Sequence, residues 1–306
     1  MGLERSRSFA ERIKSLTLEE KIQKEIFEVG LLISNEYEFM ERASLAAKII
    51  RKENMPNLIN YLANPMEKAS DFRSRFVEDR EYISVIHDSI FEILYNFEAD
   101  SIPYLKEMIL DSNIIISIKA IKTLCRFAQA SIDKDDIIAF ISENIDDLRY
   151  EVIIPTFYFL TFIKDSPAIL DIFDRYFWLY NDDCEEYADA LYVLENIYKY
   201  DKSAIDPYVH FLKEYALNKN FRDRPNLEGI VTRNIFGDDT DEINFCFNES
   251  VGEMNNIRAA LFYSKIVPDD KEIHKSLTRW YNSNIDLTLK NKIEVYLRKF
   301  SSINGG

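Results

Sequence analysis

Residues Cys184–Tyr200, CEEYADALYVLENIYKY, carry the pattern that decides the fold. Apolar residues recur there at intervals of three and four and form one stripe: Tyr187, Ala190, Leu191, Leu194, Ile197 and Tyr198. Charged residues fall on the opposite side: Glu185, Glu186, Asp189, Glu195 and Lys199. An amphipathic α-helix has this period, so the stretch is predicted to be helical.

The same period runs through most of the chain. It predicts further helices over residues 18–33, 36–51, 79–97, 102–110, 114–128, 135–145, 148–164, 167–180, 205–217 and 291–300. Pro155 lies inside one of them and predicts a kink, because proline removes a helical hydrogen bond. The chain has 7 glycines, and only four lie away from its ends, which leaves few positions for tight hairpin turns between strands. The predicted fold class is all-α.

Short polar breaks between these helices follow a regular period. Asp111, Asp146 and Asp182 are 35 and 36 residues apart, and each stands between two apolar helical segments. The repeating unit is therefore a helical hairpin. A single hairpin cannot cover its own apolar stripe, so consecutive antiparallel hairpins are expected to stack into an α-solenoid, a superhelix with one continuous core.

Residues 101–129, SIPYLKEMILDSNIIISIKAIKTLCRFAQ, resemble a HEAT repeat of the armadillo-like class. The positions that carry the resemblance are an early proline and leucine, an aspartate in the turn, and two small or apolar residues on the second helix: Pro103, Leu105, Asp111, Ala120 and Leu124. Asn181 and Ala190 repeat the spacing of two of them. HEAT units usually carry an arginine early in the second helix, where this chain has Ser117.

The resemblance is best over residues 101–217. It implies a single elongated solenoid over 1–306, with N-terminal helices in 1–100, HEAT-like units in 101–217 and irregular helical units in 218–306. HEAT proteins share a shape rather than an activity, so the resemblance implies binding in general. The partner and the oligomeric state do not follow from it.

The negative charge of the chain is concentrated in its middle. The formal net charge is −15, and residues 131–201 hold 17 Asp and Glu against 5 Lys and Arg, a net of −12. Such a field favours a basic protein partner and repels nucleic acid. Aromatic residues lie in the same stretch and could anchor a partner, so the predicted binding residues are Trp178, Tyr180, Asp182, Asp183, Glu185, Glu186 and Asp189. The alternatives are that the acidic face only aids solubility and that the aromatic side chains fill the core.

Several chemistries lack support in the sequence. Neither a G-x-G-x-x-G nor a G-x-x-x-x-G-K-[ST] phosphate loop occurs, and the histidines His87, His210 and His274 are isolated, so we expect no cofactor and no metal. The three cysteines, Cys125, Cys184 and Cys246, include no C-x-x-C pair, which favours a reducing, cytoplasmic location. The longest apolar stretch is too short to span a membrane, although Gly2 and Ser6 fit an N-myristoylation pattern.

One enzymatic alternative remains open. HEAT-like repeats also form DNA alkyl-base glycosylases, and that resemblance implies a tryptophan and an aspartate one helical turn apart, such as Trp178 and Asp182, with Trp280 as a second wall. The acidic surroundings oppose DNA binding. The sequence therefore favours a non-enzymatic solenoid that binds a basic protein, for example an immunity or inhibitor protein, with a general scaffold or adaptor as the other interpretation.

Overall fold

The computed structural model describes residues 16–67, 79–179, 184–217, 251–283, 285 and 287–304. Throughout these ranges the regular elements are α-helices and short 3₁₀ helices, and no strand occurs. The prediction of an all-α protein is confirmed for this part of the chain. Within it, packing divides the protein into two compact units, Met1–Phe159 and Leu160–Gly306, which are described separately.

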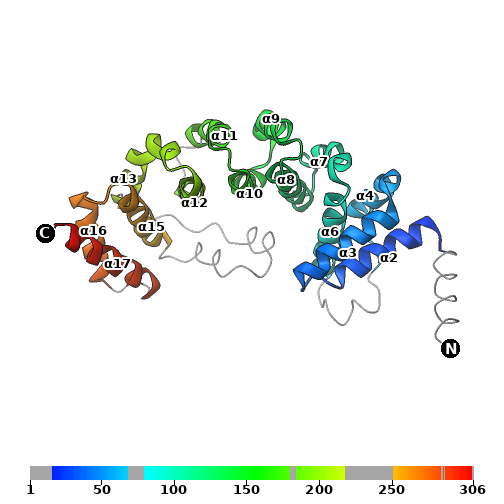
Figure 1. The fold of residues 1–306 in the computed structure, drawn as a ribbon, viewed down its shortest axis with the longest axis horizontal. Coiled ribbons are helices and arrows are strands. Elements are labelled where there is room, and N and C mark those ends of the chain that lie inside the picture. Colours follow the sequence, from blue (N-terminus) through cyan, green and yellow to red (C-terminus); the bar gives the residue numbers. More distant parts are fainter. Residues whose placement is uncertain are drawn as a thin grey trace. The chain divides into compact units, whose positions relative to one another are not determined.

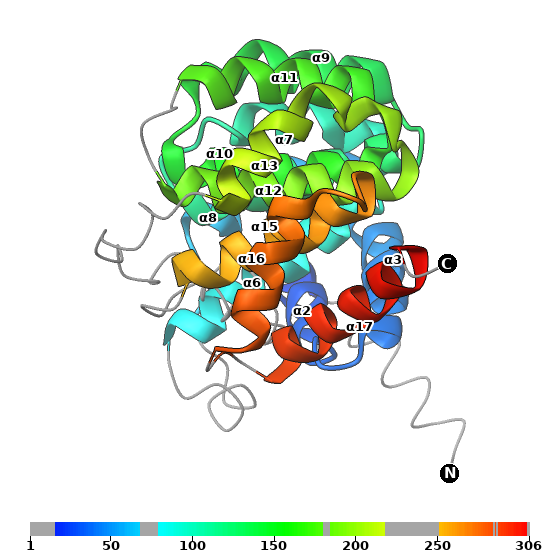
Figure 2. The same ribbon diagram turned by 90° about the vertical axis from the view of Figure 1, so that its left-hand side faces the viewer.

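The first unit contains eight described α-helices. Helix α10 is counted among them, although its last residue, Leu160, is the first residue of the second unit. Their bounds are α2 Leu18–Gly30, α3 Glu36–Ile50, α4 Met55–Ala63, α6 Asp79–Tyr95, α7 Ile102–Met108, α8 Ile114–Gln129, α9 Lys134–Asn144 and α10 Tyr150–Leu160. Figures 1 and 2 show α7 and α9 in one layer of this unit and α6 and α8 in another.

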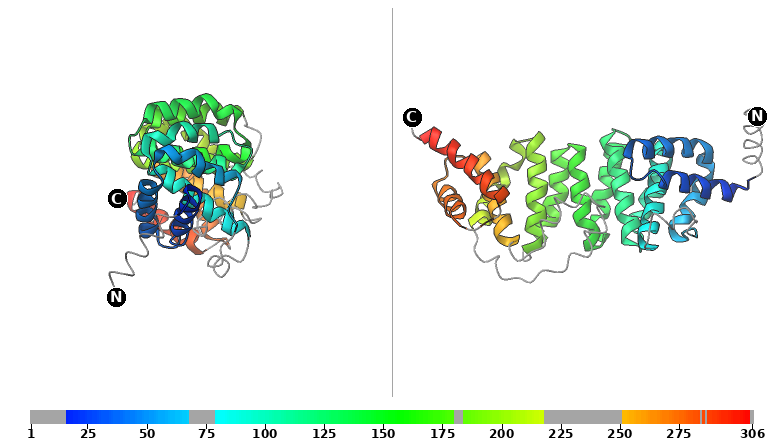
Figure 3. Two further views of the ribbon diagram at one scale, coloured as in Figure 1. Left: turned by 90° about the vertical axis from the view of Figure 1, so that its right-hand side faces the viewer. Right: turned by 90° about the horizontal axis from the view of Figure 1, so that it is seen from below.

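Helices α2, α3 and α4 pack around α6 at the N-terminal side of the first unit. Thr17 and Glu20 form a reciprocal capping box that starts α2. Arg42 on α3 pairs with Glu28 on α2 at 2.6 Å and also with the buried Glu25. Figure 3 shows α2 and α3 lying side by side in blue. The two ion pairs of Arg42 link these helices.

Helices α7 and α8 form the hairpin that the sequence places around Asp111. Asn113 caps α8 by accepting a hydrogen bond from the backbone N–H of Ile115 at 3.0 Å. The hydroxyl of the buried Ser117 donates to the carbonyl of Ile109, across the turn. Ser117 thus fastens the two helices of its own hairpin.

Helix α9 is followed by the 3₁₀ helix Ile145–Asp147, which contains the predicted Asp146, and then by α10. Arg149, which precedes α10, donates to the backbone carbonyls of Asp111 and Ser112 in the turn between α7 and α8. An arginine therefore does link the start of α10 to this earlier turn, although it stands at a different position from the one the HEAT pattern implies. Pro155 lies inside α10, as predicted.

The second unit contains six described helices. They are α11 Ser166–Leu179, α12 Cys184–Tyr200, α13 Val209–Leu217, α15 Val251–Ile266, α16 Lys271–Tyr281 and α17 Leu287–Asn304. Helices α12, α13, α16 and α17 all contact α15, and Figure 2 shows α16 and α17 side by side. The predicted break at Asp182 lies outside the described residues.

Most of the described side chains in the apolar stripe of α12 are buried, and Tyr198 is half-buried. Leu191, Leu194 and Ile197 are inaccessible to solvent, as the period of three and four predicts. Asp270 caps α16 by accepting the backbone N–H groups of Glu272 and Ile273, and Lys213 and Tyr263 hold its second oxygen at 2.9 and 3.0 Å. These bonds fasten α16 to α13 and α15.

Candidate functional site

The predicted partner-binding residues lie in the sequence from the end of α11 to the first half of α12. Tyr180, Asp182 and Asp183 lie outside the described residues. Trp178 lies near the end of α11, and Glu185, Glu186 and Asp189 lie in the first two turns of α12; for these four the structure describes the helical backbone. The largest group of described acidic side chains in the acidic block lies around α9.

Helix α9 and its flanks expose a group of carboxylates that we name the α9 acidic surface: Asp133, Asp135, Glu143, Asp146 and Asp147. All five are exposed, and none of them forms an ion pair in the described part of the chain. The fold places them outward because Ile137, Ile138 and Ile141 occupy the inner side of the same helix. The surface therefore combines negative charge with access to solvent.

One carboxylate of α9 is used differently. Asp136 pairs with Lys106 of α7 at 2.6 Å, and the Lys106 ammonium lies 4.6 Å from the centre of the Phe140 ring. This lysine fastens α9 to α7 and holds the aromatic ring beside that contact. The carboxylates of the α9 acidic surface stay free for other interactions.

Aromatic side chains follow one another closely in α10 and in the residues after it. Phe157 and Phe159 are buried, whereas Tyr158 is half-buried and Phe162 is exposed. Two of these four side chains therefore lie in the core, and one of them reaches the surface.

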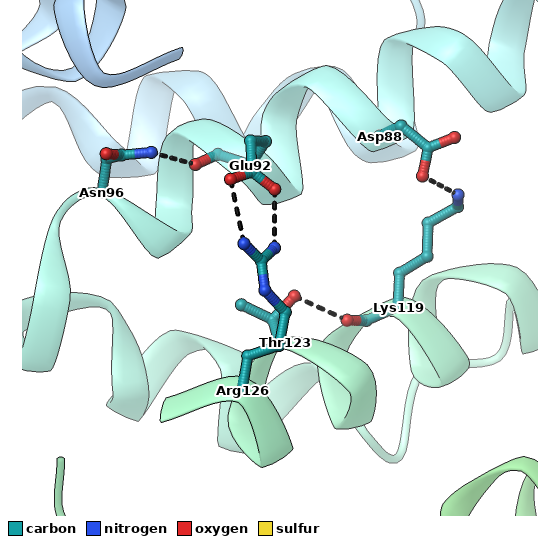
Figure 4. Close-up of polar contacts among 6 residues, drawn as sticks. All are labelled: Asp88, Glu92, Asn96, Lys119, Thr123 and Arg126. Carbon is teal, nitrogen blue, oxygen red and sulfur yellow. Dashed lines mark hydrogen bonds and ion pairs between the residues drawn. The ribbon is translucent and has the colours of Figure 1, made fainter. Parts of the chain in front are cut away.

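A second charged cluster lies between α6 and α8 and was not predicted from the sequence (Figure 4). Arg126 forms two bonds to the buried Glu92, from Nη1 to Oε2 at 2.6 Å and from Nη2 to Oε1 at 3.0 Å. The same guanidinium lies 3.9 Å from the centre of the Tyr95 ring. Lys119, two turns earlier on α8, pairs with Asp88 of α6. We name the four charged residues Asp88, Glu92, Lys119 and Arg126 the α6–α8 network.

The network keeps Arg126 ionised. Burial acts to lower the pKa of Arg126, but the hydrogen bonds and charge of Glu92 outweigh it and hold that pKa above its ordinary value. Lys122 lies between Lys119 and Arg126 on the same helix, is exposed, and has no ion-pair partner in the described part of the chain. The carboxylates of α6 thus pair with two of three neighbouring cations.

Spacing along the chain is the signal that could have found this network. Asp88 and Lys119 are 31 residues apart, and Glu92 and Arg126 are 34 apart, close to the period of the predicted hairpins. Opposite charges at one-repeat spacing face each other when neighbouring repeats pack. Charge counts alone do not contain that information.

His87 and Cys125 are both enclosed by the core of the first unit. His87 on α6 is buried, and its Nε2 lies 3.2 Å from the Leu62 carbonyl, while its Nδ1 has no hydrogen-bond partner. Burial, with the charge of Lys119, lowers the pKa of His87. Cys125 is buried, and burial raises the pKa of its thiol. A group enclosed in this way cannot reach a substrate in solution.

Neither a metal cluster nor a membrane-spanning helix occurs in the described ranges. They contain no group of three or more His, Cys, Asp or Glu side chains that could hold a metal ion. None of the described helices is both long enough and apolar enough to cross a bilayer. Trp280, the second tryptophan of the glycosylase alternative, lies on α16 and is half-buried.

Comparison with known proteins identifies no relative: no family model, no curated protein and no solved structure matches the chain.

Proposed function

We propose that the protein is a non-enzymatic α-solenoid that binds a basic protein through the α9 acidic surface. The observation that carries the binding proposal is the set of five exposed carboxylates there, which have no ion-pair partner in the described part of the chain. The candidate residues from Trp178 to Asp189 belong to the second unit and are a separate prediction.

The solenoid part of the proposal is supported by the sequence separation of side-chain contacts. Besides the two pairs of the α6–α8 network, Lys106 and Asp136 are 30 residues apart, and Tyr208 and Asp174 in the second unit are 34 apart. Contacts separated by one repeat are typical of arrays in which each hairpin packs on the next. Arg149, which donates to the turn of the preceding hairpin, adds a contact of the same kind.

The binding part rests on electrostatics. Residues 131–151 contain seven Asp and Glu and two Lys and Arg, and screening acts over about 8 Å at physiological salt. Carboxylates on one short helix and its flanks lie close enough to act as one field on an approaching protein. Such a field raises the association rate with a basic partner and disfavours nucleic acid.

The sharpest form of the proposal is an immunity or inhibitor role, in which the acidic face covers a basic toxin or nuclease. A scaffold or adaptor would use the same face without abolishing an activity of its partner. The two are distinguished by assaying the captured partner alone and in the complex, because only an inhibitor removes its activity.

The test compares two variants with the same change in net charge. The first replaces Glu143, Asp146 and Asp147 with lysine; these positions leave the first turn of α9 intact. The matched control replaces Glu53, Glu81 and Asp206, which are also exposed and have no ion-pair partner among the described residues, with lysine. The tagged full-length parent and both variants are used to capture partners from the native cell, and the captured protein is identified by mass spectrometry.

With the purified partner, we expect the α9 variant to associate about tenfold more slowly at low salt and to show a flatter salt dependence, because rim charges chiefly govern encounter. The control should associate at nearly the parent rate. Parent kinetics in the α9 variant would refute the α9 acidic surface as the binding site. Equal slowing of both variants would show a response to net charge alone, which would also refute it.

A further inference from the structure

Helix α3 presents an apolar face to solvent. Tyr37, Met40, Leu45 and Ile49 are 76%, 43%, 48% and 50% exposed. They are four of the nine large apolar side chains that are exposed in the described part of the chain, and they all lie within one helix of 15 residues. This concentration distinguishes α3 from scattered surface apolar residues, which need no explanation.

The inner side of α3 is made of smaller residues. Ala43, Ala46, Ala47 and Ile50 are buried, on the side from which α2 and α6 contact the helix. Most of the large apolar side chains of α3 therefore point away from the protein's own core. Such a concentration of exposed large apolar side chains indicates a surface that another molecule covers.

Two charged residues lie in the middle of this outer face. Glu41 and Lys48 are exposed, have no ion-pair partner in the described residues, and are separated by two helical turns. If a second α3 approaches antiparallel, with a two-fold axis between Ser44 and Leu45, each Glu41 faces a Lys48 across the axis, and the pair forms twice. In a parallel arrangement Glu41 would instead face its own copy. The charge order of the face is thus complementary to itself in one orientation only.

We propose that the outer face of α3 is a homodimer interface, in which the helix packs antiparallel against the same helix of a second copy. The apolar side chains supply the driving force, because pairing removes them from water. Glu41 and Lys48 set the orientation, because opposite charges meet across the contact in the antiparallel arrangement alone. This interface is independent of the α9 acidic surface.

The first experiment measures the mass of the full-length protein by sedimentation over a range of concentrations. We expect a reversible dimer in the parent and at least tenfold weaker association when Leu45 and Ile49 are both replaced by glutamate. The matched control makes the same change at Leu287 and Val295 of α17, which are 70% and 56% exposed, and it should dimerise as the parent does. Circular dichroism confirms that all three proteins are folded.

The second experiment tests the orientation. Glu41→Lys and Lys48→Glu each place like charges opposite one another and should weaken the dimer about tenfold, which corresponds to about 1.4 kcal/mol. The double exchange restores opposite charges and should return the affinity close to that of the parent. Ser44→Cys, next to the axis, should form a disulfide between two chains under mild oxidation, whereas the parent and Glu53→Cys should not.

A parent protein that stays monomeric at all concentrations overturns the proposal. The outer face of α3 would then be covered by something other than a second copy. A dimer that the α3 substitutions leave intact also overturns it. If the dimer depends on Leu45 and Ile49 but the double charge exchange fails to restore it, the antiparallel arrangement is wrong.

Discussion

Both the α6–α8 network and the α9 acidic surface contain aspartates and glutamates, but in the described part of the chain these carboxylates are paired with cations in the first region and unpaired in the second. Glu92 and Asp88 each face a cation of the neighbouring helix α8, and Glu92 is buried, whereas the carboxylates of the α9 acidic surface face solvent. A charge that a neighbouring helix neutralises contributes to packing. A charge without such a neighbour is available to a partner. The position of an opposite charge on an adjacent helix, rather than the number of charges, separates the two roles.

The largest expected effect comes from removing a carboxylate inside the network. Glu92→Ala leaves the guanidinium of Arg126 without its two bonds to Glu92. It should lower the free energy of unfolding by about 2 kcal/mol. This loss is smaller than for a fully buried pair, because the Arg126 side chain is 28% exposed. Urea unfolding measures the change. The control, Glu143→Ala in the α9 acidic surface, should change stability by less than about 0.5 kcal/mol. Equal losses in the two variants would remove the distinction between the regions.

A smaller effect is expected within α8 itself. Lys119→Met breaks the pair with Asp88, whose side chain is 37% exposed, and should cost about 1 kcal/mol or less. Lys122→Met removes a lysine of the same helix that has no ion-pair partner in the described part of the chain, and we expect no measurable loss in urea unfolding. If Lys122 proved the more costly to replace, the pairing seen in Figure 4 would not be what stabilises this contact.

The smallest expected effect is a pH dependence of the stability that arises from His87, the neighbour of Asp88 on α6. Burial lowers the pKa of His87 in the folded protein, so the unfolded chain binds more protons below the ordinary histidine value of 6.5. The stabilising contribution of neutral His87 is complete above pH 6.5 and is lost as the pH falls below it. Physically, a proton added at Nδ1 would be buried without an acceptor.

His87→Gln provides the comparison, because an amide can still donate to the Leu62 carbonyl but does not titrate. The stability measured by thermal or urea unfolding between pH 7.5 and 5 should fall less steeply in the variant than in the parent. Identical slopes would show that His87 does not titrate differently in the folded and unfolded states.

Helix positions were predictable from the sequence where a long apolar stripe faces the core and a polar side faces solvent. The stripe of α12 and the break at Asp111 follow from the period of three and four and from short polar turns. Helix α15 was missed because it contacts α12, α13, α16 and α17 and so carries apolar residues on several sides. Helix α16 was missed because Ile273 and Leu277 are the only two buried residues in its 11.

The candidate site was predictable only in part. Local charge density located the acidic block, and the described first part of it is exposed and without ion pairs at the α9 acidic surface. The pairing of Glu92 with Arg126 was not predictable, because a charge pattern does not show which helices become neighbours. The outer face of α3 was also missed, since an apolar stripe indicates a core whichever side of the helix it occupies.

The bonds from Arg149 to the turn of the preceding hairpin end on backbone carbonyls rather than on side chains. Every residue offers a carbonyl, so the identities of Asp111 and Ser112 do not matter to this link. The side chains of the turn can therefore change while the bonds from Arg149 to its backbone persist. A link of this kind leaves no mark on the sequence of the turn that it holds.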